Sequence, residues 1–231
     1  MSILTTTISL ALVDAVNPCA LAVMAIILTA LLFKNPTQKS KVLAGGLMFT
    51  LAVFILYFIY GAILIQFFSH FIPETGKTSM YVFRGFGVLA ILLGLLNLKD
   101  FLYYKPGSVG TEMPLFMRPK VKSIINKATS PWGAFLIGII VTVFLLPCTI
   151  GPYIIASGNL SQLSFYQTLP LLLLYNLIFI LPMVAITLII YFGLTTVDKV
   201  SGWKENNIRY LHLIEALILI VLGILMFTGI L

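Results

Sequence analysis

The chain has 231 residues, of which 60% are hydrophobic and only 9% are charged, and its formal net charge is +7. Soluble domains carry about 25% charged residues, so this composition excludes an ordinary water-soluble fold. An excess of basic residues can indicate a nucleic-acid-binding protein. Here the basic residues lie between apolar runs, in the loops where membrane topology places them.

Six apolar runs follow one another along the chain, each compatible with a membrane crossing of about 20 residues. We expect the spans at residues 3–33, 42–68, 80–98, 132–156, 165–192 and 208–231. The strongest evidence is the stretch between Lys127 and Asp198, which contains no Asp, Glu, Lys or Arg. The first run lacks the basic start of a signal peptide, since the first Lys or Arg is Lys34. We therefore expect it to remain as a span.

The Lys and Arg residues are concentrated in alternate loops between these spans. They are Lys34, Lys39 and Lys41 in the first loop, Lys99, Lys105, Arg118, Lys120, Lys122 and Lys127 in the third, and Lys199, Lys204 and Arg209 in the fifth. Only Lys77 and Arg84 lie on the other side. Cytoplasmic loops carry the excess of Lys and Arg. We therefore expect a multi-pass protein of the plasma membrane with both termini extracytoplasmic.

The third loop contains an amphipathic pattern. Val121, Ile124, Ile125 and Ala128 recur at helical spacing, and basic residues occupy the other face. This pattern is typical of a short helix that lies on an anionic leaflet. An ordinary connector next to the membrane fits the same residues equally well.

A single shift of 129 positions superimposes three pairs of residues: Cys19 on Cys148, Pro18 on Pro147, and Gly94 on Gly223. Because each half would contain three spans, the second half must enter the membrane upside down relative to the first. Such inverted repeats are common in transporters, whose sites lie near the midplane on helices interrupted by Gly or Pro. We predict an all-α membrane domain over 1–231, with six transmembrane helices in two inverted three-helix repeats. Repeat one would occupy 1–98, a cytoplasmic loop 99–130, and repeat two 131–231.

The two cysteines of the chain each follow a proline, in Pro18-Cys19 and Pro147-Cys148. Proline kinks or breaks a helix and is favoured as its first residue. We therefore expect the first and fourth spans to be interrupted there, with each cysteine in the first turn of a half-helix. The positive end of a helix dipole stabilises anions such as a thiolate, the form that exchanges with disulfides. The alternatives are a static structural disulfide and two ordinary small apolar side chains.

Polar residues flank the two cysteines. Ionisable residues inside a membrane are usually functional, and Asp14 would either move protons or cap the outer half-helix in a watery vestibule. Asn17 and Thr149 are further candidate supporting polar residues. His212 and Glu215 fall near the inner end of the sixth span, where we expect exposure to water.

Proline and glycine next to the cysteines are candidate hinges. Gly151 and Pro152 would loosen the fourth helix, and Pro18 and Pro147 would break the first and fourth. Zinc sites typically need four ligands from Cys, His and carboxylates, and the sequence shows no such framework. We expect no metal and no cofactor.

The segment Pro147-Cys148-Thr149, with Pro152 four residues after the cysteine, resembles the CcdA family, which is similar to the membrane domain of DsbD. The resemblance covers essentially the whole chain. It implies a transmembrane electron transporter, in which cytoplasmic thioredoxin reduces a Cys19–Cys148 disulfide. The dithiol would then reduce an extracytoplasmic thioredoxin-like protein, often one that serves cytochrome c maturation. Such a protein is a thiol–disulfide electron carrier rather than a conventional enzyme.

Soluble partners cannot reach thiols at the centre of a hydrocarbon core about 30 Å thick. Electron transfer would therefore need alternating access, with the cysteine pair presented to each side in turn. The main alternative is a small-solute or soft-metal-ion exporter of the same six-helix design, with the cysteines as ligands for an ion such as Cu(I). A quinone-linked thiol oxidase is less favoured, because that class usually has more cysteines in close pairs.

Overall fold

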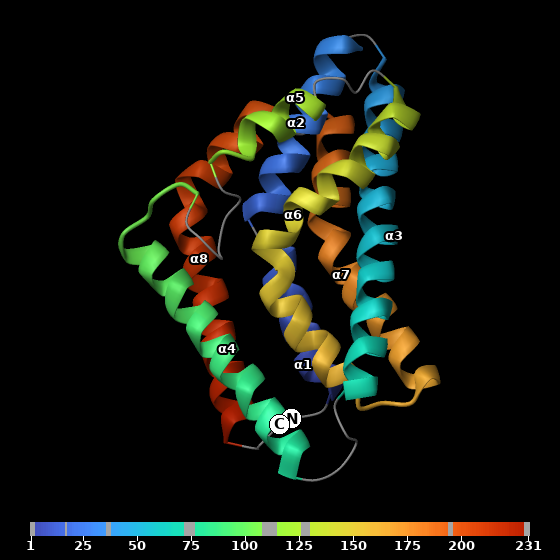
Figure 1. Ribbon diagram of the computed structural model, residues 1–231. Helices are drawn as coiled ribbons and strands as arrows, with labels where there is room; N and C mark the ends of the chain where they lie inside the picture. The colour runs from blue at the N-terminus through green and yellow to red at the C-terminus, as the bar shows by residue number, and fades with distance from the viewer. Residues whose placement is uncertain are drawn as a thin grey trace.

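The computed structural model describes residues 3–16, 18–35, 38–71, 77–107, 115–125, 130–193 and 196–228. All regular structure in these ranges is helical (Figure 1). The helices are α1 (Ile3–Ala15), α2 (Pro18–Lys34), α3 (Lys39–Phe71), α4 (Lys77–Leu102), α5 (Arg118–Ile125), α6 (Pro131–Leu160), α7 (Phe165–Tyr191) and α8 (Val197–Phe227).

Most of these helices are suited to lipid. In the described part of the chain, α3, α4, α7 and α8 each contain a segment long and apolar enough to cross a membrane. The bent pair of α1 and α2 passes the same test when it is taken as one span. Many large apolar side chains of these helices are exposed, among them Ile63, Leu92 and Leu181, as expected where lipid is the solvent. The prediction of an all-helical, multi-pass membrane protein is confirmed. The arrangement of six spans in two inverted halves stays a prediction.

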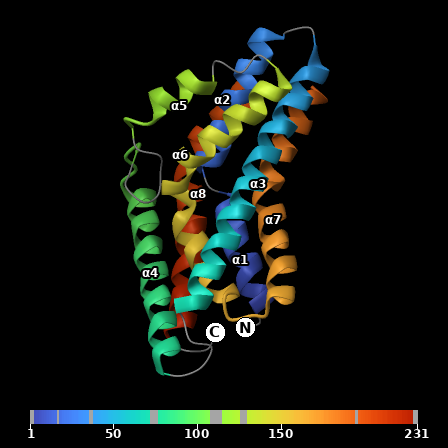
Figure 2. The same cartoon turned by 45° about the vertical axis from the view of Figure 1, so that its right-hand side comes forward.

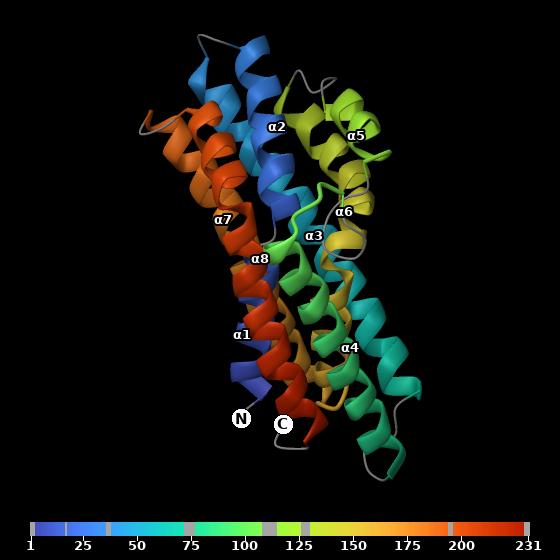
Figure 3. The ribbon, with the colours of Figure 1, turned by 90° about the vertical axis from the view of Figure 1, so that its left-hand side faces the viewer.

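The helices run back and forth between the two ends of an elongated bundle. The start of α1 and the end of α8 lie at the same end (Figures 1 and 3). The end of α2, the start of α3, the end of α7 and the start of α8 lie at the opposite end, and α5 lies toward that end as well (Figures 2 and 3). The basic segments around Lys34, Arg118 and Lys199 therefore gather at one end of the bundle.

The break predicted at Pro18 is confirmed, because α1 ends at Ala15 and α2 begins at Pro18. The axes of α1 and α2 differ in direction by 47°. The predicted interruption of the fourth span is wrong, since α6 continues past Pro147 without a gap in the helix. A proline removes one hydrogen bond and can bend a helix without ending it, and α6 changes direction along its length (Figure 1). Asn17 lies outside the described residues.

Helices α4 and α8 approach each other closely enough for their backbones to touch. A Cβ atom added to Gly223 would lie 2.7 Å from the Gly87 carbonyl oxygen and 2.9 Å from the Ile91 amide nitrogen. One added to Gly94 would lie 3.1 Å from the Ala216 carbonyl oxygen. Small residues permit such contacts between membrane helices. We call this contact, formed around Gly87, Gly94 and Gly223, the α4–α8 seam; the shift of 129 positions had paired two of its glycines.

The amphipathic pattern of the third loop forms a helix, α5, over Arg118–Ile125. Val121 and Ile125 are buried against the bundle, whereas Lys120 and Lys122 are exposed. The helix packs on α6 and α2. Of the two interpretations that the sequence left open, the helix is therefore the one observed, with its apolar face buried on the bundle. Its position on an anionic leaflet stays a prediction, and Ala128 lies outside the described residues.

Candidate functional site

A cavity of about 460 Å³ lies between α2, α5 and α8. Its back wall is formed by α2, which begins at Pro18 because the proline ring has no amide hydrogen to satisfy there. The residues of α2 that line it are Cys19, Leu21, Ala22, Val23, Ala25 and Ile26. These side chains are apolar or weakly polar. We call this space the Cys19 cavity.

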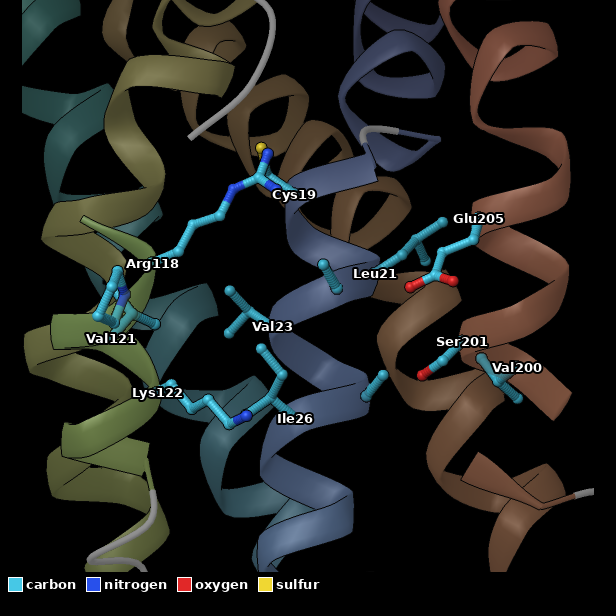
Figure 4. Close-up of a pocket in the computed structure, with 13 residues that line it drawn as sticks. Cys19, Leu21, Val23, Ile26, Arg118, Val121, Lys122, Val200, Ser201 and Glu205 are labelled. Carbon is cyan, nitrogen blue, oxygen red and sulfur yellow. The ribbon is translucent and has the colours of Figure 1, made fainter. Parts of the chain in front are cut away.

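The two side walls of the Cys19 cavity differ in charge. Arg118 and Lys122 line it from α5, and Ser201 and Glu205 line it from α8. Figure 4 shows the Arg118 side chain extended toward the Cys19 sulfur, and the Lys122 side chain reaching toward Ile26. The cavity therefore combines an apolar back with cations on one side and a carboxylate and a hydroxyl on the other.

Cys19 is the second residue of α2 and is only 6% exposed. It stands in the first turn of a helix that begins at the break, as the sequence predicted. Cys148 belongs to α6, but the side chains of Pro18, Pro147 and Cys148 lie outside the described part. A reversible Cys19–Cys148 disulfide therefore stays a prediction.

Asp14 is completely buried in the last turn of α1. The Tyr175 hydroxyl donates a hydrogen bond of 2.5 Å to its Oδ2 atom. Its Oδ1 atom accepts no hydrogen bond from any residue that the structure describes. This burial excludes a watery vestibule around the carboxyl group in this conformation, and it leaves the proton-movement interpretation open.

Asp14 adjoins a cluster of three buried tyrosines, Tyr57 of α3, Tyr153 of α6 and Tyr175 of α7. The Tyr153 hydroxyl donates to the Tyr57 carbonyl oxygen, and the Tyr153 and Tyr175 rings meet edge to face with centroids 5.2 Å apart. We call these three residues the tyrosine cluster. Sequence reasoning missed it, although tyrosines in the middle of spans are informative because they usually favour the membrane interfaces.

Thr149, one of the predicted supporting residues, joins this cluster. Its Oγ1 atom and the Tyr57 hydroxyl are 2.5 Å apart and share a hydrogen bond between α6 and α3. Thr149 also donates to the Leu145 carbonyl oxygen within its own helix. The structure thus gives Thr149 a specific partner on another helix.

We expect Thr149→Val to lower the free energy of unfolding by about 1 kcal/mol, because a buried hydrogen bond contributes about that much and the Tyr57 hydroxyl would lose a partner. Thermal unfolding in detergent measures the effect. Thr142→Val is the matched control, since Thr142 is equally buried in α6 and its hydroxyl donates a hydrogen bond to the Gly138 carbonyl oxygen of its own helix. Equal destabilisation by both substitutions would contradict a role for the interhelical bond.

The candidate hinge residues Gly151 and Pro152 are buried within α6. A Cβ atom on Gly151 would collide with the Leu93 side chain of α4. Gly151 therefore permits close contact between α6 and α4. Its action as a hinge stays a prediction.

His212 and Glu215 are buried between α8 and α4, so the expectation that water surrounds them is wrong. The His212 Nδ1 atom lies 2.8 Å from the Asn97 Oδ1 atom of α4 and 3.8 Å from the Glu215 Oε2 atom. The physical reason is that α4 covers this face of α8. The sequence gives no direct signal of that pairing.

A family model described as Sap, sulfolipid-1-addressing protein (SfLAP), matches residues 8–230. The chain belongs to this family. The resemblance to the CcdA family is therefore corrected: two Pro-Cys steps in leucine-rich spans do not define a family, whereas the SfLAP match runs over nearly the whole chain. No curated protein and no solved structure matches the chain.

Proposed function

We propose that this SfLAP-family protein binds an anionic lipid in the Cys19 cavity and moves it between the two leaflets of the membrane. The observation that carries the proposal is an apolar cavity beside α2 with two cations on one wall, both from the amphipathic helix α5. The family description supports it, because a sulfolipid is an amphiphile with an acidic headgroup.

Arg118 and Lys122 are one turn apart on α5 and both line the Cys19 cavity. A guanidinium group presents donors in a planar fork that matches the oxygens of a sulfate or phosphate. Arg118 is half-buried, and an ion pair is stronger where water is partly excluded. Lys122, which is exposed, adds a second positive charge to the same wall.

The other walls suit the rest of such a lipid. The α2 side chains of Leu21, Ala22, Val23, Ala25 and Ile26 form an apolar surface for the start of an acyl chain. Ser201 and Glu205 offer a hydroxyl and a carboxylate to hydroxyl groups of the headgroup. The volume of about 460 Å³ is within the usual range for small-molecule sites.

The orientation and the repeat belong to the same proposal. The gathering of Lys and Arg at one end supports a cytoplasmic location of that end, with α5 on the inner leaflet of the plasma membrane. The helix contacts support two inverted halves of three spans each, with the α1–α2 pair equivalent to α6, α3 to α7, and α4 to α8. If the two halves are equivalent, the contact of α3 with α6 corresponds to the contact of α7 with α1. The contact of α4 with α6 likewise corresponds to the contact of α8 with α2, and all four contacts are present.

Native mass spectrometry of the purified protein tests the proposal with two glycolipids that differ by one group. Sulfated galactosylceramide should bind about tenfold or more tightly than galactosylceramide, since one charge-assisted contact contributes about 1.5–3 kcal/mol. Ala22→Trp, which fills the Cys19 cavity, should abolish the preference. Phe33→Trp is the control, because Phe33 is exposed on α2 outside the cavity. Equal binding of the two lipids would overturn the proposal.

Thiol–disulfide electron transfer is the second candidate function. Three observations favour it: Cys19 lines a cavity, Arg118 extends toward its sulfur (Figure 4), and α2 contacts α6, which carries Cys148. The proposed partners are those that the resemblance to the CcdA family implied, cytoplasmic thioredoxin and an extracytoplasmic thioredoxin-like protein.

The variant Cys148→Ser separates the two functions. If electron transfer is the function, this substitution should abolish reduction of the protein by thioredoxin, because a single cysteine cannot form the intramolecular disulfide. If lipid movement is the function, the preference for sulfated galactosylceramide should be retained. Thiol labelling after incubation with reduced thioredoxin, followed by lipid binding on the same sample, gives both readouts. Retained binding combined with no reduction of the unsubstituted protein would eliminate the redox candidate.

A further inference from the structure

Asp14 is a carboxyl group inside the membrane-spanning part of the bundle, and its surroundings contain no compensating cation in the described residues. It is 0% exposed. Burying an ionised carboxylate is very unfavourable unless it is paired and hydrogen-bonded, and intramembrane ionisable residues commonly mark proton or ion pathways. The Tyr175 hydroxyl supplies one hydrogen bond to Oδ2. Oδ1 has none from the described part of the chain.

The groups that face Asp14 come from the helices packed against α1, which are α6, α7 and α8. From α7, Tyr175 is in direct contact, and from α6, Tyr153 interacts with the carboxyl group electrostatically. Tyr57 of α3 packs edge to face on the Tyr153 ring, with centroids 5.4 Å apart. Within the described residues, α8 contributes no charged or titratable group that acts on Asp14. Among the described residues, the titratable groups around the carboxyl are therefore tyrosines, which are neutral over the ordinary pH range.

A second buried oxygen, beside the tyrosine cluster, also lacks a hydrogen-bond donor among the described residues. Asn176 of α7 donates from Nδ2 to the Leu172 carbonyl oxygen at 2.8 Å, and its Nδ2 lies 3.5 Å from the Tyr153 hydroxyl. Its Oδ1 atom is buried and accepts no hydrogen bond in the described part of the protein. Buried polar atoms are nearly always satisfied. Two buried acceptors at the tyrosine cluster therefore lack a hydrogen-bond donor within the described residues, and of the two only the Asp14 carboxyl group can take up a proton.

We propose that Asp14 binds and releases one proton and that this proton is coupled to lipid binding in the Cys19 cavity. The coupling to lipid binding rests on the proposed function, whereas the proton site at Asp14 does not. On uptake, a proton from water adds to the Asp14 carboxylate and gives the neutral acid. On release, the same proton returns to water, and no other bond forms or breaks.

The break between α1 and α2 supplies the physical connection. Asp14 and Tyr175 attach the end of α1 to α7, and α2, which starts four residues after Asp14, forms the back wall of the Cys19 cavity. An ionised Asp14 needs water, so ionisation favours conformations in which α1 moves away from α7. Such a movement displaces the start of α2, where Cys19 and Leu21 line the cavity.

The direction of the coupling follows from the conformation described. In it the carboxyl group is buried and the cavity is formed, so the neutral acid stabilises the conformation that binds lipid. A ligand and a proton that prefer the same conformation strengthen each other's binding. The affinity for lipid should therefore fall as the pH rises through the titration of Asp14.

The first experiment measures binding of sulfated galactosylceramide to the full-length protein as a function of pH. Affinity should fall about tenfold or more with rising pH, and Asp14→Asn should make it independent of pH while binding remains. Tyr175→Phe, which removes the hydroxyl donor, should move the pH profile without flattening it. Glu215→Gln, a buried carboxyl variant on α8 outside the tyrosine cluster, should keep the original profile. An Asp14→Asn profile identical to that of the unsubstituted protein would overturn the coupling.

The second experiment does not depend on lipid. Infrared difference spectra between two pH values should contain the carbonyl band of a protonated carboxylic acid, and Asp14→Asn should lose that band while Glu215→Gln keeps it. If no lipid binds at any pH but the band is lost in Asp14→Asn, the proton site stands and the proposed lipid function fails. A spectrum unchanged by Asp14→Asn would overturn the proton site, whatever the result with lipid.

Discussion

Replacing Arg118 and Lys122 together by glutamate is expected to lower the affinity for sulfated galactosylceramide about a hundredfold or more. Each cation would contribute a charge-assisted hydrogen bond of about 1.5–3 kcal/mol, and each 1.4 kcal/mol corresponds to about a factor of ten. The new carboxylates would also repel the headgroup. Native mass spectrometry with the sulfated lipid measures the effect, and binding of the neutral galactosylceramide should change much less.

The matched control is the double variant Lys105→Glu with Lys120→Glu. It changes the net charge of the protein by the same amount, but neither residue lines the Cys19 cavity. Lys120 is even on the same helix as the tested pair. If both double variants weakened binding equally, the general field of the basic end would be responsible and the cavity would not be the site.

Replacing Gly87 by leucine is expected to destabilise the α4–α8 seam. A Cβ atom there would lie 2.8 Å from the Gly223 carbonyl oxygen and 2.9 Å from the Phe227 amide nitrogen. Both atoms are backbone, so the helices must separate. Overpacking of this kind costs about 1–3 kcal/mol. Thermal unfolding in detergent should show the loss, together with a smaller fraction of monodisperse protein on size-exclusion chromatography.

Gly85→Leu tests whether the contact, rather than the loss of a glycine, is responsible. Gly85 lies two positions earlier on α4, and a Cβ atom there would meet nothing within 4 Å. Leucine has a higher helix propensity than glycine by up to about 1 kcal/mol, so this control should be neutral or stabilising. A Gly87→Leu protein as stable as Gly85→Leu would mean that the backbones of α4 and α8 are not in contact.

The helices themselves could be predicted well from the sequence, because apolar length and charge-free stretches determine where a chain crosses lipid. The fifth expected span, 165–192, differs from α7 at one end by a single residue. Pro18 begins a helix as expected, since proline is favoured as the first residue of a helix. Pro147 does not, because the effect of a proline inside a long apolar helix depends on the neighbours that cover the bend.

The candidate site was predicted only in part. Cys19 and Asp14 attracted attention because of their chemistry, and both lie where α1 gives way to α2. The contributions of Arg118 and Tyr175 could not be foreseen, since they are about 100 and 160 residues away in sequence and depend on which helices pack together. The burial of His212 and Glu215 could not be predicted from the sequence either, because it depends on the packing of α4 against α8.

The short helix α1 has a consequence for how the protein is made. Its 13 residues are fewer than the roughly 20 needed to cross the hydrocarbon core, and its final carbonyl groups are left without helical partners. Protein must cover these groups, and the helices that surround α1 are α6, α7 and α8, which the ribosome delivers last. The amino-terminal segment should therefore reach its final depth only after synthesis of the carboxy-terminal half, so that truncated nascent chains leave it loosely inserted and accessible to protease.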